Sequence, residues 1–193
     1  MSDALALLEL RGVASGYAIL NIMLKHSPVT ILEANLIEPG HFLILYTGAV
    51  AEVEEAHQRV LEERSQQILA QFLLPFAHDD ILKGLKGADL RLSGDAYDCL
   101  GVVETKSISG ALLSLDHILK NTHTRLVGLR VAGALGGKGY FILCGAQHDV
   151  EWALDLASDK SMELGGIVDK EVIATPHDDA IEWLLRPTPF RIQ

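Results

Sequence analysis

An internal repeat is the feature that most constrains the fold of this 193-residue chain. With an offset of 95 residues, ALALLELRGVASGYAILNIMLKHS, which begins at Ala4, aligns with CLGVVETKSISGALLSLDHILKNT, which begins at Cys99. The offset is 97 for HFLILYTG and KGYFILCG, which begin at His41 and Lys138, and 99 for the two HDD triplets that follow. Matches that keep their order over about ninety residues, with gaps only at turn-like positions, indicate a tandem duplication.

Each half of the repeat predicts the same order of elements, β-α-β-β-α-β-α. Short apolar runs predict the first three strands of each half, at Leu5–Leu10, Val29–Leu36 and Phe42–Thr47, and at Leu100–Thr105, Arg125–Val131 and Tyr140–Cys144. Helices are predicted at Tyr17–Leu24, Ala51–Gln67, Ala111–Leu119 and Asp149–Leu164, with a fourth strand after each second helix and short terminal helices from near Asp79 and Asp178. This order predicts an α/β (α+β) chain of two ferredoxin-like, split βαβ domains, each with an added helix.

The predicted helix Tyr17–Leu24 is apolar nearly all round, whereas Ala111–Leu119 has one apolar stripe. A helix that is apolar all round is buried on more than one side, so we expect contacts beyond its own domain. The stretch from Gly87 to Asp98 holds two glycines and three aspartates, which is typical of a linker. We therefore expect a first domain at 1–90, a linker at 91–98, a second domain at 99–187 and a tail at 188–193.

The composition excludes several classes of protein. A content of 49% hydrophobic and 22% charged residues excludes intrinsic disorder. With 16 basic against 26 acidic residues and no basic cluster, we expect no nucleic acid partner. No apolar run reaches the ~18 residues of a membrane span, and the first residues are not typical of a signal peptide. Two cysteines, Cys99 and Cys144, are too few for a disulfide framework and indicate a reducing compartment, so we expect a soluble cytoplasmic protein.

The motifs that could carry chemistry are weak. GALGGKG, from Gly133 to Gly139, has three residues instead of four between its first glycine and the Gly-Lys pair, and a glycine replaces the Ser or Thr of a phosphate loop. It lies between two predicted strands, so we interpret it as a tight turn. The triplets at His78 and His177 each open a predicted helix, where aspartates cap free N–H groups and favour the helix dipole, which is preferred here to metal binding.

The remaining histidines and cysteines form no cluster at metal-ligand spacing. We expect His57, His117 and His148 to lie at a surface or an interface, and the two cysteines to be small buried side chains. No pair of base and nucleophile emerges from the sequence. We therefore predict no catalysis, no metal and no cofactor.

Six segments resemble the bacterial microcompartment shell domain: ALLELRGVASGYAILNIMLK and LGVVETKSISGALLSLDHILK, IEPGHFLILYTG and GALGGKGYFILCG, and LLPFAHDD and VIATPHDD. The tandem arrangement resembles the two-domain, trimer-forming class of these shell proteins, closest to the non-permuted propanediol-utilisation type. This resemblance covers nearly the whole chain. It implies a structural homotrimer whose six domains form a pseudohexagonal tile. Such tiles join other shell proteins in a sheet around enzymes, with an axial pore for small metabolites.

The resemblance also implies roles for particular residues. The turns between the second and third strands of each domain would line the pore, with Ile37, Glu38, Pro39 and Gly40 from the first domain, and Ala134, Leu135, Gly136 and Gly137 from the second. Two lysines and two histidines would lie along the tile edges: Lys25, Lys120, His78 and His177.

Two departures from the family pattern bear on function. Iron–sulfur relatives have a cysteine in the first pore turn, where this chain has Glu38, and such clusters are usually held by thiolates. The arginine that usually precedes the edge histidine is replaced by Phe76 and Thr175. Two alternatives stay open: the same scaffold binding a metal or redox centre at the trimer axis, and a ferredoxin-like module that binds a ligand in a pocket within one subunit.

Overall fold

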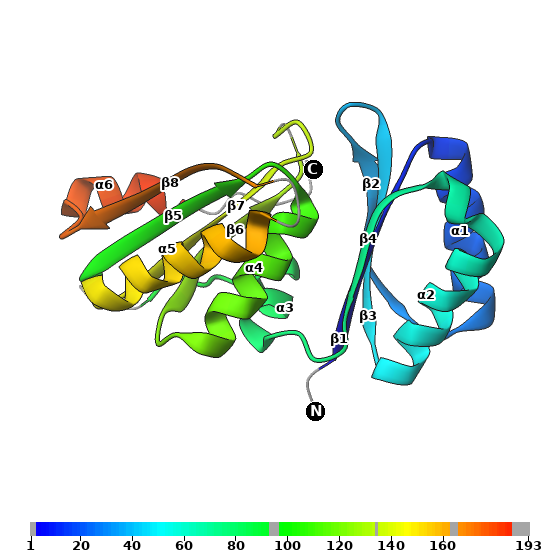
Figure 1. Ribbon diagram of the computed structural model, residues 1–193, viewed down its shortest axis with the longest axis horizontal. Helices are drawn as coiled ribbons and strands as arrows, with labels where there is room; N and C mark the ends of the chain where they lie inside the picture. The colour runs from blue at the N-terminus through cyan, green and yellow to red at the C-terminus, as the bar shows by residue number, and fades with distance from the viewer. Residues whose placement is uncertain (1–2, 93–96, 134, 163–165, 187–193) are drawn as a thin grey trace. The chain divides into compact units, whose positions relative to one another are not determined.

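The computed structural model describes residues 3–92, 97–133, 135–162 and 166–186. The chain divides into two compact units between Asp79 and Asp80, and each contains a four-stranded sheet (Figure 1). This division groups the short helix α3 (Asp79–Leu85), which we assigned to the first domain, with the second unit. Residues 93–96 of the predicted linker, residue 187 and the tail 188–193 lie outside the described residues.

The first unit follows the predicted order of elements. Its elements are β1 (Ala4–Leu10), α1 (Val13–His26), β2 (Thr30–Ile37), β3 (His41–Gly48), α2 (Val50–Arg64), a 3-10 turn (Ser65–Gln67) and β4 (Ile68–Leu74). All neighbouring strands are antiparallel, in the order β2-β3-β1-β4, and α1 and α2 cover one face (Figure 1). The core lies between this face and the helices, where alternate residues of β1 and β3 meet Ile19, Met23, Val53 and Val60.

The second unit repeats this topology. Its further elements are β5 (Cys99–Thr105), α4 (Ile108–Asn121), β6 (Arg125–Val131), β7 (Gly139–Gly145), α5 (Gln147–Met162), β8 (Ile167–Ala174) and α6 (Asp178–Leu184). The strand order is β6-β7-β5-β8, again antiparallel throughout. The predicted fold class, two ferredoxin-like domains in tandem, is confirmed.

Different helices pack on the two faces of the second sheet. The position of Gly101 lies against Leu154 and Val150 of α5, so alternation along β5 turns Leu100 to the opposite face. On that opposite face, Leu100 belongs to an apolar cluster with residues of β6 and β7 and with Leu185, next to α6. The helix α6 therefore packs on its own sheet through one side only.

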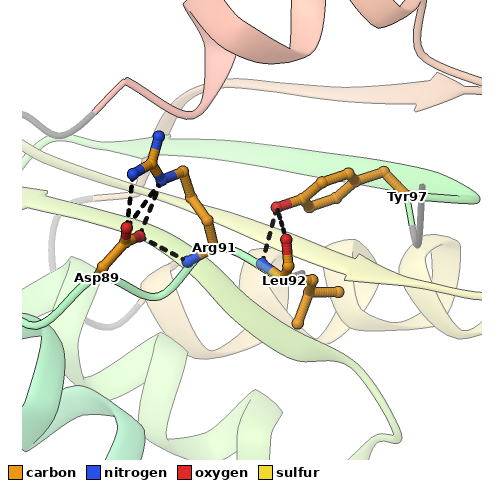
Figure 2. Close-up of polar contacts among 4 residues, drawn as sticks. All are labelled: Asp89, Arg91, Leu92 and Tyr97. Atoms are coloured by element: carbon orange, nitrogen blue, oxygen red, sulfur yellow. Dashed lines mark hydrogen bonds and ion pairs between the residues drawn. The ribbon is translucent and has the colours of Figure 1, made fainter. Parts of the chain in front are cut away.

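The described part of the predicted linker is well packed. Leu92 and Tyr97 pack against the same apolar cluster, and the Tyr97 hydroxyl accepts the backbone N–H of Leu92 at 2.8 Å (Figure 2). Arg91 binds both carboxylate oxygens of Asp89, and these side-chain hydrogen bonds lower the pKa of Asp89 to about 2. Among the described residues, no helix is long and apolar enough to cross a membrane.

We expected His57 to lie at a surface or an interface, but the structure buries it inside the first unit. His57 is only 5% exposed, and its Nδ1 lies 2.6 Å from the Tyr46 hydroxyl, while Nε2 bonds the side chain of Gln71. Burial raises the pKa of Tyr46, so its hydroxyl remains protonated and donates to Nδ1, which leaves Nε2–H to donate to Gln71. A polar group can be buried when both of its polar atoms find partners, and here β3 and β4 supply them. His117 and His148 are exposed, as predicted.

Candidate functional site

The first predicted pore turn is a tight β2–β3 hairpin. Ile37 ends β2 and is buried, whereas Glu38, Pro39 and Gly40 are exposed. The backbone N–H of Gly40 donates to the carbonyl of Ile37 at 2.9 Å and closes the turn. Gly40 has a φ of 101°, a conformation that favours glycine. The turn thus presents one acidic side chain, Glu38, at an exposed tip.

The second turn occupies the same place in the repeat and is two residues longer, as the change of offset predicted. The backbone N–H of Ala132 donates to the carbonyl of Lys138 at 3.1 Å, and that of Lys138 donates to Leu135 at 3.2 Å. Gly136 is exposed, and Leu135 and Gly137 are half-buried. Ala134, the remaining predicted pore residue, lies outside the described residues.

The strand register identifies one more residue of the second turn, the counterpart of Glu38. Leu36 pairs with Phe42 and Val131 pairs with Gly139, so the residues that follow these pairs correspond at an offset of 95. Gly133 therefore stands where the first turn has Glu38. Its carbonyl accepts the Arg130 guanidinium at 2.9 Å. The first turn thus has a carboxylate at the position where the second has a glycine held by an arginine.

A contact between an acidic and a basic side chain lies at the base of each turn, and sequence reasoning missed both. His41 Nδ1 is 2.6 Å from Glu9 Oε1, and Lys138 Nζ is 2.5 Å from Glu104 Oε1. Each pair ties a central strand to its neighbour, β1 to β3 and β5 to β7. The signal was present in the repeat, because Glu9 aligns with Glu104 and His41 with Lys138. The contacts themselves depend on strand pairing, which places Glu9 next to His41 and Glu104 next to Lys138.

Comparisons with known proteins settle the family. The BMC domain model matches residues 4–76 and, separately, residues 99–176. The chain belongs to the BMC domain family. It is 32% identical over 178 residues to the bacterial microcompartment shell protein PduT of Citrobacter freundii, an alignment that covers 92% of this chain and 95% of PduT.

Solved structures agree with this assignment. A microcompartments protein from Desulfitobacterium hafniense DCB superimposes with a TM-score of 0.82 at 30% identity, covering 93% of this chain and 98% of that one. The fused permuted hexameric shell protein MSM0275 from the RMM microcompartment gives a TM-score of 0.57 at 22% identity, over 85% of this chain and 86% of that one, and shares the fold. The predicted family, the tandem arrangement of BMC domains and a structural shell role are confirmed.

The two predicted edge lysines of this BMC protein have different surroundings. Lys25 is exposed in the last turn of α1. Lys120 occupies the same place in α4, but its Nζ lies 2.6 Å from Oδ2 of Asp116, one helical turn earlier. The repeat places Asn21 in α1 where α4 has Asp116, so only the second domain can form this ion pair within its helix.

The predicted edge histidines lie just before the terminal helices of the BMC domains. His78 is half-buried ahead of α3, and His177 is the exposed N-cap of α6. We expected the aspartates to cap these helices, and for α6 this was wrong. The His177 ring accepts the backbone N–H of Asp179 at 3.2 Å, while Asp178 and Asp179 lie in the first turn, where their charge favours the helix dipole.

The residues of this BMC protein do not fit an iron–sulfur cluster. Its two cysteines lie within strands, Cys99 in β5 and Cys144 in β7, and both are buried as predicted. Burial raises the pKa of both thiols, which disfavours the thiolate that ligates metal. Within the described ranges, no group of three or more His, Cys, Asp and Glu side chains could hold a metal ion.

Two further features have no ligand chemistry of their own. The described residues of GALGGKG lie between β6 and β7 or begin β7, as expected, instead of forming the strand-to-helix turn of a phosphate loop. An open groove of 280 Å³ in the first unit is lined by polar side chains of α1 and α2: His26, Glu55, Gln58, Arg59 and Glu62. Two of its side chains bond each other, with Gln58 donating to Glu62 at 3.0 Å. This polar groove does not favour the alternative of a small-molecule pocket within one subunit.

Proposed function

We propose that three copies of this chain form a ring of six BMC domains, a tile of a microcompartment shell with a pore at its axis. In this arrangement the β2–β3 and β6–β7 turns alternate around the pore. The tile is a structural and permeation element, to which we assign no catalytic step. Its partners are two further copies of itself, other shell proteins and the enclosed enzymes, within the bacterial cytoplasm.

The observation that carries this proposal is a difference in burial between the two halves of the repeat. Tyr17 and Leu24 of α1 are 62% and 52% exposed, whereas the matching Leu112 and Leu119 of α4 are 0% and 7% exposed. Large exposed apolar side chains on one face mark an interaction surface. The apolar face of α1 is thus open to a partner, and we take that partner to be a further copy of this chain. Repeated head-to-tail contacts of this kind close into a ring.

The turns account for the selectivity of the proposed pore. Ile37, Glu38, Pro39 and Gly40 would alternate with Ala134, Leu135, Gly136 and Gly137 around the axis. Three copies of Glu38 with about 8 Å between them, at an effective dielectric constant near 20, would repel by about 2 kcal/mol per pair. Such a ring attracts cations and disfavours the passage of anionic metabolites.

The edge residues account for assembly of the tiles. Lys25 and Lys120 lie near the ends of equivalent helices, and long lysine stems can lie along an interface while the ammonium group finds an oxygen partner. His78 and His177, with Phe76 and Thr175 nearby in sequence, complete the proposed edges.

Electron microscopy of the purified protein tests this proposal. Class averages are expected to show a six-lobed ring with threefold symmetry, and concentrated samples to show hexagonally packed sheets. Single particles of one or two lobes at all concentrations would overturn the proposal.

A further inference from the structure

The helix α3 belongs to the first copy of the repeat but packs within the second unit, and its counterpart in the second copy, α6, carries an exposed tryptophan. Gly84 of α3 packs against β6. A Cβ atom placed on Gly84 would lie 3.2 Å from Leu129 Cδ2 and 3.1 Å from Leu90 Cδ1, tighter than ordinary van der Waals contact. A small residue on the helix thus meets a large residue on the edge strand.

At the equivalent positions of the second copy, the large side chain is on the helix and the small one is on the strand. HDDILKG in the first half aligns with HDDAIEW in the second, so Trp183 of α6 stands in the place of Gly84. Ala34 of β2 stands in the place of Leu129, because Ala34 pairs with Ile44 and Leu129 pairs with Phe141 at matching positions of the two sheets. The large residue is here on the helix and the small one on the strand.

Trp183 is available for such a contact. It is 71% exposed, although the Arg186 guanidinium lies 5.3 Å from the centre of its ring. The opposite side of α6 carries Ile181 and Leu184, which pack with Leu100 on the second sheet. A tryptophan held outward by a docked helix has little side-chain freedom to lose on binding, which favours it as an interface anchor.

Ala34 is half-buried against the core of the first unit, and its apolar neighbours Tyr17 and Leu36 are exposed; we name these three residues the β2 patch. Ala34 and Leu36 lie on the same face of β2, and the Tyr17 ring lies 5.2 Å from that of Phe42, which pairs with Leu36. Leu36 is 56% exposed, whereas the matching Val131 of the second domain is 2% exposed. Tyr17 and Leu36 of the β2 patch are thus exposed, whereas the matching Leu112 and Val131 of the second domain are buried.

We propose that Trp183 of one chain packs on the β2 patch of the next chain and closes the ring between chains. This inference rests on the proposed homotrimer and names the residues of its seam. The Gly84–Leu129 contact, made inside the second unit by a helix of the first repeat and a strand of the second, is the template, since a head-to-tail ring would repeat such a contact from chain to chain. The sizes are complementary in both pairs: glycine against leucine within the second unit, and tryptophan against alanine in the proposed contact between chains.

Substitution of the anchor tests the proposal. Trp183→Ala is expected to raise the protein concentration at which the trimer dissociates by at least about 30-fold, the effect typical of a buried interface tryptophan. Far-UV circular dichroism should stay unchanged, because Trp183 is exposed in the single chain. Trp152→Ala is the matched control: Trp152 is 56% exposed on α5, away from the seam, and its loss should leave dissociation within threefold of wild type.

A double variant tests whether Trp183 and Ala34 pack against each other, or whether each single substitution only lowers the stability of the chain. Ala34→Leu alone should overfill the seam and weaken the trimer, and Trp183→Gly alone should leave it empty. Together they recreate the pair seen at Gly84 and Leu129, so the double variant should bind more tightly than either single variant.

The outcomes distinguish this inference from the proposed function. If wild type is a trimer and Trp183→Ala dissociates no more readily, the seam assigned here is wrong while the ring stands. If the double variant is no tighter than the single ones, the correspondence between the two seams is wrong. If wild type is a monomer at all concentrations, both the ring and the seam fail.

Discussion

The carboxylate of Glu9 lies 2.6 Å from Nδ1 of His41, directly beneath the exposed β2–β3 turn. The other BMC domain has Glu104 and Lys138 in the same place, so the duplication kept an acid and a base here while the base itself changed. We expect the Glu9–His41 pair, which joins two neighbouring strands, to restrain the turn that ends at His41, and the Glu104–Lys138 pair to restrain the second turn.

Removal of this pair should loosen the first turn. Glu9→Gln is expected to lower the free energy of unfolding by about 0.5–1 kcal/mol, the range of a partly exposed ion pair. Hydrogen–deuterium exchange of the Gly40 and His41 amides should become faster, while the β6–β7 turn is unchanged. Glu54→Gln, at an exposed position of α2, is the control. Equal exchange in Glu9→Gln and wild type would contradict a restraining role.

The acid stability of the first unit should depend on His57. Burial lowers the pKa of His57 below its usual value near 6.5, so the folded protein binds fewer protons than the unfolded one when the pH falls through that range. Stability contributed by neutral His57 is complete above about pH 6.5 and is lost as the pH falls toward the lower, folded pKa.

Thermal unfolding at pH 7.5 and pH 5.5 checks this linkage. Wild type should lose more stability between these two conditions than His57→Gln, which keeps a polar group but cannot titrate. His117→Gln, at an exposed position, should behave as wild type. The same loss in His57→Gln and wild type would show that other groups control the acid transition.

The charge of the first turn should control permeation. In reconstituted shells, Glu38→Gln is expected to raise the relative permeability of an anionic solute over a neutral one of equal size, because the variant removes three carboxylates from the proposed axis. Glu54→Gln removes the same number of charges from an exposed helix and serves as the control. Unchanged selectivity in Glu38→Gln would place this carboxylate away from the permeation path.

The two edge lysines should contribute unequally to assembly. Lys120 is paired with Asp116 within α4, whereas Lys25 follows an asparagine one turn earlier. Lys25→Ala is therefore expected to reduce sheet formation more than Lys120→Ala, measured by the fraction of protein that sediments as sheets. Lys120→Ala should mainly lower stability, by about 0.3–0.5 kcal/mol. Equal losses of sheet formation would show that the Asp116 pair does not restrain Lys120.

Much of the fold followed from the sequence because the repeat doubled each local signal. The apolar run at Leu5–Leu10 was ambiguous by itself, but its second copy at Leu100–Thr105 fixed the order of elements. The end of α2 was less certain: we predicted Gln67, and the helix ends at Arg64 because its last residues tighten into a 3-10 turn.

Contacts between distant strands could not be predicted in the same way. His57 has the polar character of a surface residue, and only the positions of Tyr46 and Gln71 make its burial favourable. Glu9 and His41 are 32 residues apart, and their contact depends on the register of β1 against β3. The exchange of sizes between Gly84 and Trp183 likewise acquires meaning only when α3 is seen against β6.

The solution mass of the purified protein, measured by light scattering after size exclusion, tests the central claim most directly. Three chains of 21.0 kDa have a mass of about 63 kDa, or about 126 kDa if two rings stack. For a ring of three chains, we expect one of these two values. A mass of 21.0 kDa at every concentration tested would contradict the ring, because one chain has no axis at which its turns could form a pore.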